Sequence, residues 1–365
     1  MADRETRTFR EIVIRDIIIA LLVTVLGGVI VALIVGEGRF GSQATKPTET
    51  ASAPEMATVP AQAASQATAP PTLPPDDRVA TPEMRFVFLG YPQQGQPQSG
   101  MGIISGNKLS NVQNIDFLTN GGELSPNGLF IAYDCGPHSE RGLHIVDVDG
   151  SNARMVKILS GDFCTDVRWS PDNTKLSYQD PKDYSLHIVD ISTGKDSQIP
   201  NTLGAEWHWW SPAGNEIVYG LNLYFLCNRD HTAPQCELSN KAFRLLYITD
   251  LSGNSRQLTL ADDFEPCANA SNQVDAWAPT WSPDGTTIAF TECSKLYSIN
   301  RNGSNLIQLA DSAYSPRWSP DSKWIIFIHN NDVLTRISSD GRAIEEMGTL
   351  PYWGGPFSIG PLVNP

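Results

Sequence analysis

Positive charge is scarce in this sequence of 365 residues. It has 26 Lys and Arg residues against 40 Asp and Glu residues, so its net charge is −14 at pH 7. Nucleic-acid binding needs clustered Lys and Arg opposite the phosphates, so this balance excludes that class of partner. The length suggests two domains or one large β domain, and either is large enough to bury a core.

Linear motifs of common enzyme classes are also missing. The sequence has no G-x-S-x-G, no P-loop, no H-E-x-x-H, no EF-hand loop and no G-x-G-x-x-G. These motifs place nucleophiles, phosphates, metals and dinucleotides in many enzymes. We therefore expect a protein that is not an enzyme and that holds no cofactor.

Charge is absent from one long apolar run at residues 17–36. As a helix such a run is about 30 Å long, which matches the hydrocarbon core of a membrane. It is longer than the apolar part of a typical signal peptide, and no A-x-A-like cleavage site closely follows it. We expect a transmembrane helix here, with a buried core helix as the alternative.

Basic residues flank this run unequally. Arginines are frequent in residues 1–16, whereas only Arg39 and Lys46 follow closely. The positive-inside rule then predicts a short cytoplasmic tail, residues 1–16, with the remainder outside the cell membrane. No cysteine precedes Cys135, which excludes a lipidated N-terminal cysteine.

Residues 37–82 contain few residues that could form a core. From residue 41 on, this segment consists mainly of Ala, Thr, Pro, Gln and Ser. Such a composition cannot bury enough apolar surface to offset the entropy of ordering the chain. We expect a disordered, partly polyproline-II tether that holds the next domain roughly 35 Å from the membrane. A simple spacer is favoured over a recognition motif.

One short phrase recurs through residues 83–365. It stands as LSPNG at 124–128, WSPDN at 169–173, WSPAG at 210–214, WSPDG at 281–285 and WSPDS at 318–322. The proline presets φ, and the following Asp, Asn or Ser can bond back to the backbone. The last residue, often Gly or Asn, tolerates a positive φ. The phrase therefore predicts a tight turn. Repeats of about 40 residues with several short strands are typical of propeller blades.

Strand-like segments follow each phrase in a constant order. An apolar strand such as TTIAFTE comes first, then a strand such as LHIVD, then a short fourth strand. The unit is four antiparallel strands, A to D, with the phrase joining A to B. Five units are explicit, and the two ends of the domain, MRFVFLGY with MGIISG and PYWGGPFSIGP, supply a sixth. We predict an all-β, six-bladed β-propeller closed by its C-terminal strand, with seven blades as the alternative.

This repeat resembles the TolB-like, WD-like propeller family. The match is best at residues 281–303, where WSPDGTTIAF is followed by LYSINRNG, and it covers about residues 83–365. The resemblance implies the fold but little about function, because propellers host many activities. TolB itself carries a globular α/β domain before its propeller. Here an anchor and a tether stand in that place, so the resemblance does not imply a role in the Tol–Pal envelope system.

The cysteines are few but even in number. They are Cys135, Cys164, Cys227, Cys236, Cys267 and Cys293. Six cysteines outside the membrane suggest disulfides, with 15 possible pairings. The strand order places all six on the propeller face where the B-to-C and D-to-A loops open, which favours the pairs Cys135–Cys164, Cys227–Cys236 and Cys267–Cys293. A metal site is the alternative, but C-x2-C spacing is missing.

The D-to-A loops on this cysteine-bearing face carry acidic and aromatic residues. The acidic ones are Asp162, Asp166, Glu206, Asp262, Asp263, Glu265 and Asp311, and the aromatic ones are Phe163, Trp207, Phe264, Trp277 and Tyr314. Such a rim suits a basic peptide, a cationic ligand or Ca²⁺. The alternative is that the acids are solvated and the aromatics pack between blades. Residues 83–365 carry a net charge of −12, so the acidity belongs to this domain.

The histidines divide into two groups. His144 and His187 occupy a repeat position that holds Tyr in other units, which indicates a structural role. His208 stands beside three tryptophans where other units have Val or Pro. We include it in the rim set, with packing as the alternative.

The resulting hypothesis is a membrane-anchored, extracytoplasmic propeller that binds a protein, peptide or small ligand on this face, with an envelope protein or peptide as partner. The alternative function is an extracytoplasmic enzyme acting on a carbohydrate or ester, with carboxylates and His208 at the channel mouth. A sensor that signals through its cytoplasmic end is disfavoured, because a tail of residues 1–16 is too short for an output domain.

Overall fold

The computed structural model describes residues 83–91, 98–105, 107–115, 122–134, 141–160, 166–229, 232–238, 242–265, 267, 274–330, 332–350 and 353–361. The predicted tail, membrane span and tether lie outside the described residues. Within the described ranges, no helix is both long and apolar enough to cross a membrane.

The first sheet joins the two ends of the domain. Its strand order is β24 (Trp353–Pro361), β1 (Met84–Tyr91), β2 (Gln98–Ser105) and β3 (Lys108–Ile115). Strands β1 and β24 are antiparallel, with Met84 opposite Pro361 and Phe88 opposite Phe357. This pairing confirms the predicted closure by the C-terminal strand.

Three further sheets each contain four antiparallel strands in chain order. The first is β4 (Glu123–Leu124), β5 (Phe130–Tyr133), β6 (Gly142–Asp147) and β7 (Arg154–Ile158). The second is β8 (Val167–Trp169), β9 (Lys175–Gln179), β10 (Leu186–Asp190) and β11 (Asp196–Gln198). The third is β20 (Ala313–Trp318), β21 (Trp324–His329), β22 (Val333–Ser338) and β23 (Ile344–Thr349).

The remaining sheet has eight strands and departs from the expectation. It comprises β12 (Ala205–Trp210), β13 (Glu216–Asn222), β14 (Ala242–Asp250), β15 (Ser255–Gln257), β16 (Val274–Trp281), β17 (Thr287–Glu292), β18 (Lys295–Asn300) and β19 (Ile307–Ala310). Six separate sheets were predicted, but the described residues form four separate four-stranded sheets and this larger one. The reason is that β14 begins early enough for Ala242 and Arg244 to pair in parallel with Val274 and Asp275 of β16.

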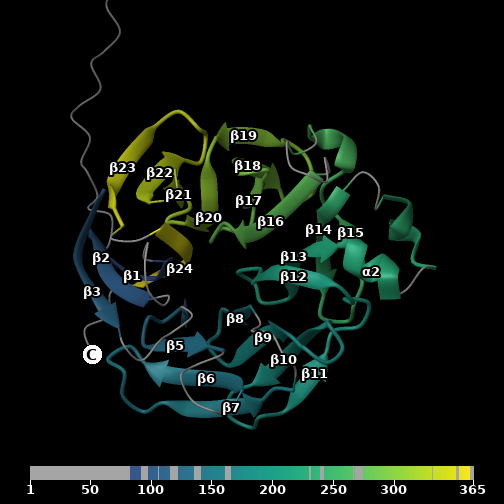
Figure 1. Cartoon of the computed structure of the whole chain (residues 1–365), viewed down its shortest axis with the longest axis horizontal. Helices are drawn as coiled ribbons and strands as arrows, with labels where there is room; N and C mark the ends of the chain where they lie inside the picture. Colours follow the sequence, from purple (N-terminus) through teal and green to yellow (C-terminus); the bar gives the residue numbers. More distant parts are fainter. Residues whose placement is uncertain are drawn as a thin grey trace, which may run out of the picture. The chain divides into compact units, whose positions relative to one another are not determined.

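Figure 1 shows the sheets arranged around a centre, with β8, β12, β16, β20 and β24 facing inward. The fold is therefore an all-β, propeller-like arrangement of blade-like sheets. We call the central region that the inner strands surround, where the side chains of Arg168, Trp209 and Arg317 meet, the channel. Three short helical segments, α2 (Leu223–Arg229), η1 (Pro234–Leu238) and η2 (Ala261–Asp263), lie in connections between strands.

The recurring phrase forms the predicted turn. In the repeat at 169–173, the Ser170 hydroxyl donates to Asp172 at 2.6 Å and accepts from the Lys175 N–H at 2.9 Å. Asn173 then takes a positive φ of 61°. The bond from Ser170 lowers the pKa of Asp172 to about 2. Equivalent Ser-to-Asp bonds of 2.6 Å recur at Ser282 and Ser319.

The tryptophan of the phrase connects neighbouring sheets. The indole N–H of Trp169 donates to the Glu123 carbonyl at 2.9 Å, and that of Trp318 donates to the Thr280 carbonyl at 3.2 Å. Both indoles are buried. Each bond joins an inner strand to the inner strand that precedes it, so the repeated Trp helps to hold the sheets side by side.

Two of the three predicted disulfides are confirmed. Cys227 on α2 is bonded to Cys236 on η1, with Cα atoms 5.5 Å apart. Cys267 is bonded to Cys293, with Cα atoms 5.3 Å apart. The predicted pair Cys135–Cys164 lies outside the described residues.

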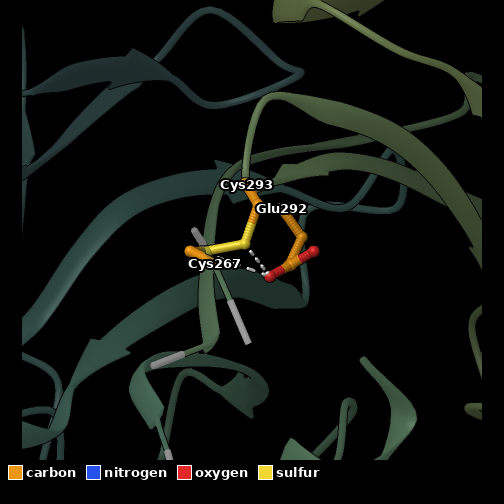
Figure 2. A group of neighbouring side chains, drawn as sticks. All are labelled: Cys267, Glu292 and Cys293. Atoms are coloured by element: carbon orange, nitrogen blue, oxygen red, sulfur yellow. Dashed lines mark hydrogen bonds between the residues drawn. A yellow bond between two sulfur atoms is a disulfide. The ribbon is translucent and has the colours of Figure 1, made fainter. Parts of the chain in front are cut away.

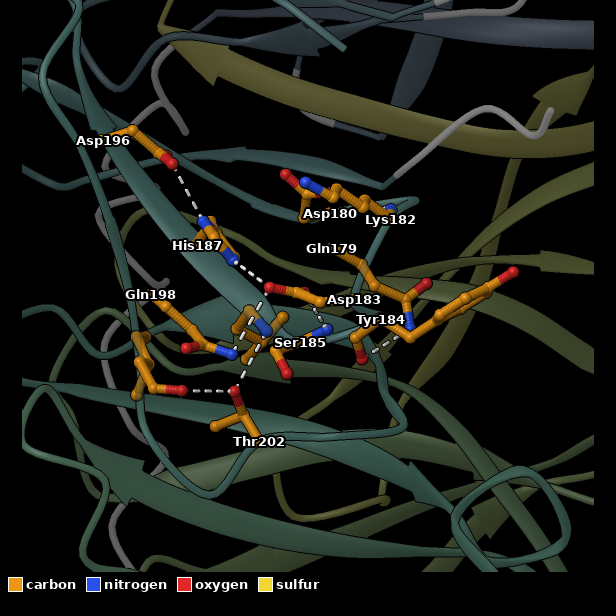
Figure 3. A network of polar contacts seen from close by, with 12 residues as sticks. Gln179, Asp180, Lys182, Asp183, Tyr184, Ser185, His187, Asp196, Gln198 and Thr202 are labelled. Atoms are coloured by element: carbon orange, nitrogen blue, oxygen red, sulfur yellow. Dashed lines mark hydrogen bonds and ion pairs between the residues drawn. The ribbon is translucent and has the colours of Figure 1, made fainter. Parts of the chain in front are cut away.

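His187 has the structural role expected of its repeat position. Its Nδ1 lies 3.0 Å from Asp196 and its Nε2 lies 3.0 Å from Asp183, as Figure 3 shows. Burial lowers the pKa of His187, but the hydrogen bonds to Asp196 and Asp183 outweigh it and raise the pKa above its ordinary value. The imidazole thus connects β10 with β11 and with the loop before β10.

Candidate functional site

The repeat places one residue of every inner strand at the channel. In β8, β12, β16 and β20 it is the residue just before the Trp of the turn phrase. In β4 and β24 it is the residue before Leu124 and Ile359, which stand in place of that Trp. We call this set the channel ring. Its members are Glu123, Arg168, Trp209, Thr280, Arg317 and Ser358.

A buried ion pair occupies one side of the channel ring. Nη1 of Arg168 lies 2.9 Å from Oε2 of Glu123, and its Nη2 lies 2.6 Å from Oδ1 of Asp166. The Ser358 hydroxyl donates to Glu123 at 3.0 Å. Burial raises the pKa of Glu123, and the nearby charge of Arg168 opposes that rise. Arg168 is therefore compensated by two carboxylates, one of them almost fully buried.

Trp209 lies between the two arginines of the channel ring. The guanidinium carbon of Arg317 lies 4.4 Å from the centre of the Trp209 ring, and that of Arg168 lies 4.8 Å from it. Arg317 also lies 5.7 Å from the ring of Phe357. A guanidinium over an indole face is a favourable cation–π arrangement. These contacts connect β20 with β12 and β24 across the channel.

Arg317 differs from Arg168 in having no ion pair with any described residue. It is 4% exposed, and its Nη1 donates to the Pro316 carbonyl at 2.8 Å. Its Nε, like that of Arg168, has no partner among the described residues. Burial lowers the pKa of Arg317 to about 10, although the charge of Glu123 opposes this shift. An arginine buried without a bonded carboxylate is costly, because its hydration is lost without full replacement.

A cavity of about 250 Å³ lies at the end of the channel formed by the turn phrases. Its lining includes five of the six channel-ring residues and prolines of four turn phrases, Pro126, Pro171, Pro212 and Pro283. The indoles of Trp210 and Trp281 belong to its lining, and their buried nitrogens have no partner among the described residues. The cavity is therefore walled by aromatic rings, and the charged side chains of Glu123, Arg168 and Arg317 also line it.

His208 is buried rather than placed on the rim. It is 1% exposed, and its Nε2 lies 2.7 Å from the Ser177 hydroxyl on β9. Burial lowers the pKa of His208 to about 4, so the imidazole is neutral at pH 7. Its Nδ1 lies 3.8 Å from Oδ2 of Asp166, and neither atom has a hydrogen-bond partner in the described structure. His208 thus packs between β12 and the neighbouring sheet.

Three of the predicted rim aromatics form one cluster. Trp207 meets Trp277 edge-on at 5.7 Å, and Trp277 lies 6.3 Å from Tyr314, measured between ring centres. They come from the beginnings of β12, β16 and β20, and each is half-buried. We call Trp207, Trp277 and Tyr314 the aromatic cluster. It lies on the inner strands, at the end that the D-to-A connections enter.

Strand bulges position this cluster. Register shifts occur between Glu206 and Trp209 and at the equivalent places in β16 and β20. The φ angles of Trp207, Ala278 and Ser315, which share one repeat position, are 49°, 50° and 52°. A bulge adds one residue to a strand and redirects the side chains on either side of it.

Charged groups accompany the aromatic cluster but compensate one another. Nε of Arg244 lies 2.9 Å from Glu206, and its Nη1 lies 2.6 Å from Asp275. The Asn222 amide also donates to Glu206 at 2.9 Å. Glu206 is therefore held in a network rather than free on the rim.

The other predicted rim residues that the structure describes differ in their burial and contacts. Phe264 is buried against Phe290 and Tyr297, in the blade core. Asp262, Asp263 and Glu265 are exposed at η2, and Asp311 accepts a bond from the Gln308 amide at 3.0 Å. Asp162 and Phe163 lie outside the described residues. A Ca²⁺ site at the acidic rim stays a prediction.

One further cluster combines a carboxylate with sulfur. Glu292 contacts both sulfurs of the Cys267–Cys293 disulfide, as Figure 2 shows. Burial raises the pKa of Glu292 to about 7. Metal binding through these three residues would need thiolates, and both sulfurs are covalently bonded to each other. The cluster in this form therefore does not suit a metal ion.

Sequence reasoning missed the channel ring. The signal was available, because Glu123, Arg168 and Arg317 are charged residues inside predicted strands, one position before the turn. A charged residue at a strand position expected to be buried indicates a partner across the fold. The linear order does not say which strand supplies that partner.

Comparisons with known proteins support the fold defined above. The chain matches the crystal structure of TolB from Acinetobacter baumannii with a TM-score of 0.57 and 15% identity, covering 76% of this chain and 66% of that one. It matches a putative TolB from Agrobacterium tumefaciens with a TM-score of 0.50 and 18% identity, covering 75% of this chain and 91% of that one. A chain of the Nidogen/Laminin complex matches with a TM-score of 0.53 and 9% identity, covering 76% and 98%.

These likenesses extend to the fold and no further. The chain spans just under two thirds of the length of the Acinetobacter protein. No protein-family model matches the sequence. No curated protein matches it either. The structure is thus similar to TolB-like propellers.

Proposed function

We propose that this chain is a membrane-anchored binding protein whose propeller-like domain engages a protein or peptide at the aromatic cluster. The observation that carries the proposal is the convergence of Trp207, Trp277 and Tyr314 from three inner strands. Aromatic side chains bury large areas at little entropic cost and are enriched at the centres of protein interfaces. The matched chain of the Nidogen/Laminin complex, which has a similar fold and comes from a protein–protein complex, is consistent with such a role.

The proposal includes the arrangement expected from the sequence. The eight-stranded sheet would be two blades, β12–β15 and β16–β19, joined only through the parallel pairing of β14 with β16, so that the ring has six blades. Residues 17–36 would anchor the chain with the propeller outside the cell membrane. The two disulfides support an oxidising location.

The test is a peptide-display selection on the full-length chain in lipid nanodiscs. Peptides enriched by the wild-type chain are compared with those enriched by Trp277→Ala. Loss of a central interface aromatic costs about 2 kcal/mol or more, which is about a 30-fold loss of affinity. We therefore expect the enriched peptides to be lost from the variant.

The matched control is Tyr224→Ala, which removes an aromatic ring on α2 that is 65% exposed and away from the inner strands. This variant should retain the peptides. Equal enrichment by wild type and Trp277→Ala would contradict the proposal. Turnover in a screen of carbohydrate and ester substrates, lost in Glu206→Gln, would support the enzymatic alternative instead.

A further inference from the structure

The two channel arginines are compensated to different degrees. Arg168 has two carboxylate partners, at 2.9 and 2.6 Å, whereas among the described residues Arg317 has a hydrogen bond only to the carbonyl of Pro316, at 2.8 Å. Both are buried, at 9% and 4% exposure. Charged groups are rarely buried without a partner, and such a group in a concave site is a candidate for ligand binding.

Stacking orients the guanidinium of Arg317. Its guanidinium carbon lies over the Trp209 ring, 4.4 Å from the ring centre, and 5.7 Å from the centre of the Phe357 ring. A stacked guanidinium keeps its N–H groups in its own plane, where they fit the two oxygens of a planar carboxylate. Arg168 also lies over Trp209, with its guanidinium carbon 4.8 Å from the ring centre.

The cavity beside Arg317 selects the size and charge of its ligand. Its volume of about 250 Å³ suits a small acid or the end of a chain. The lining includes Glu123, whose oxygens are bonded to Arg168 and Ser358. The domain as a whole is acidic. A group of single negative charge therefore fits better than a phosphate dianion, which Glu123 would repel.

The indole donors at the cavity support the same ligand. Trp169 and Trp318 donate to backbone carbonyls of the preceding inner strand, at 2.9 and 3.2 Å. Trp210 and Trp281 hold the same repeat position and border the cavity, yet their Nε1 atoms have no partner in the described structure. Two indole N–H groups beside the cavity thus lack an acceptor among the described residues.

We propose that the cavity at the turn end of the channel is a carboxylate-binding site in which Arg317, stacked on Trp209, bonds the carboxylate. The site is separate from the aromatic cluster and does not depend on the function proposed for it. The carboxylate belongs either to a free small acid or to a peptide.

The experiment uses the full-length chain in lipid nanodiscs with two carboxylate probes. Acetate represents the free acid, and N-acetyl-tetraalanine with a free C-terminus represents the peptide. The amidated form of the same peptide is the neutral comparison. Binding is measured by calorimetry and by tryptophan fluorescence, with chloride holding the ionic strength constant.

We expect saturable binding of at least one carboxylate and none of the amide. Tighter binding of acetate assigns the site to a small acid, and tighter binding of the peptide assigns it to a chain end.

Arg317→Gln should weaken this binding at least tenfold. The matched control is Arg336→Gln, because Arg336 also stacks on a tryptophan, Trp324, at 4.1 Å, but pairs with Glu345 at 2.8 Å on outer strands. The control should bind as wild type does. If Arg317→Gln does not fold by circular dichroism, Arg317→Lys replaces it, and the loss of the planar fork should still weaken binding severalfold.

Three results would overturn the proposal. The first is the absence of saturable binding by both carboxylates. The second is unchanged affinity in the folded Arg317 variant. The third is saturable binding of the amidated peptide with the same affinity as the free peptide.

Discussion

Nη1 of Arg168 lies 2.9 Å from Oε2 of Glu123, and both side chains are almost fully buried where β8 and β4 face the channel. Their residues are 45 positions apart in the chain. The pair joins two sheets at their inner strands, so weakening it should destabilise the closed ring.

Glu123→Gln should destabilise the protein. It leaves Arg168 with Asp166 as its one remaining carboxylate, and breaking a buried ion pair costs about 3 kcal/mol. Urea unfolding measures the change in the free energy of unfolding. Glu345→Gln is the control, because that carboxylate is 37% exposed and its pair with Arg336 contributes less than about 1 kcal/mol. Equal losses in the two variants would contradict the prediction.

Arg317→Met should stabilise the protein. The substitution removes a buried charge whose desolvation costs several kcal/mol and gives up a cation–π contact worth roughly 2 kcal/mol. The expected net gain is about 1 kcal/mol in the free energy of unfolding. Arg336→Met should instead lower the free energy of unfolding, because it breaks the bond to Glu345. A loss of stability in Arg317→Met would show that Arg317 is compensated in the folded protein.

Glu292 should make stability fall as the pH rises. Its pKa is about 7 in the folded protein against 4.5 for an ordinary Glu, because burial disfavours the charged form. The folded protein therefore keeps a proton that the unfolded chain releases between pH 4.5 and 7. The contribution of this group to the free energy of unfolding is fully present below pH 4.5 and is lost as the pH rises through 7. Its slope is at most about 1.4 kcal/mol per pH unit.

The measurement is urea unfolding of wild type and Glu292→Gln at several pH values. Gln resembles the protonated carboxyl, so the difference between the two proteins should change with pH in that window. A constant difference would mean that Glu292 titrates normally in the folded protein.

Removing the disulfides one pair at a time should give unequal losses. The chain-entropy model predicts about 3.5 kcal/mol for Cys267–Cys293, which spans 26 residues, and about 2.6 kcal/mol for Cys227–Cys236, which spans 9. Each pair is replaced by two serines to avoid a free thiol, and stability is measured by urea unfolding. Peptide mapping without reduction checks the pairing itself. Free thiols at these four positions in the folded protein would refute the predicted bonds.

Several features of the fold could be predicted because they depend on local chemistry. The turn phrase positions Ser, Asp and a residue with positive φ within five positions, and the bonds from Ser170 to Asp172 and Lys175 form as expected. The pairing of β1 with β24 followed from counting strands in an incomplete unit. Two disulfides followed from the same strand order.

Other features could not be predicted, since they depend on residues distant in the chain. His208 was placed on the rim, yet its ring lies against Ser177 inside the fold. Phe264 packs in a blade core on Phe290, although its neighbours Asp263 and Glu265 are exposed. A loop sequence shows which residues are polar or apolar, but not which of them the neighbouring sheet covers.

The sequence by itself therefore determined the repeat, its turns, the order of strands and the closing strand, because these follow from contacts over a few residues and from the repeat period. Only the tertiary structure decided that Trp209 contacts both Arg168 and Arg317 and that Arg317 has no bonded carboxylate in the part of the chain that the structure describes. These three residues come from inner strands of different sheets. They meet only when the ring closes, and the spacing within one repeat carries no information about what lies across the channel.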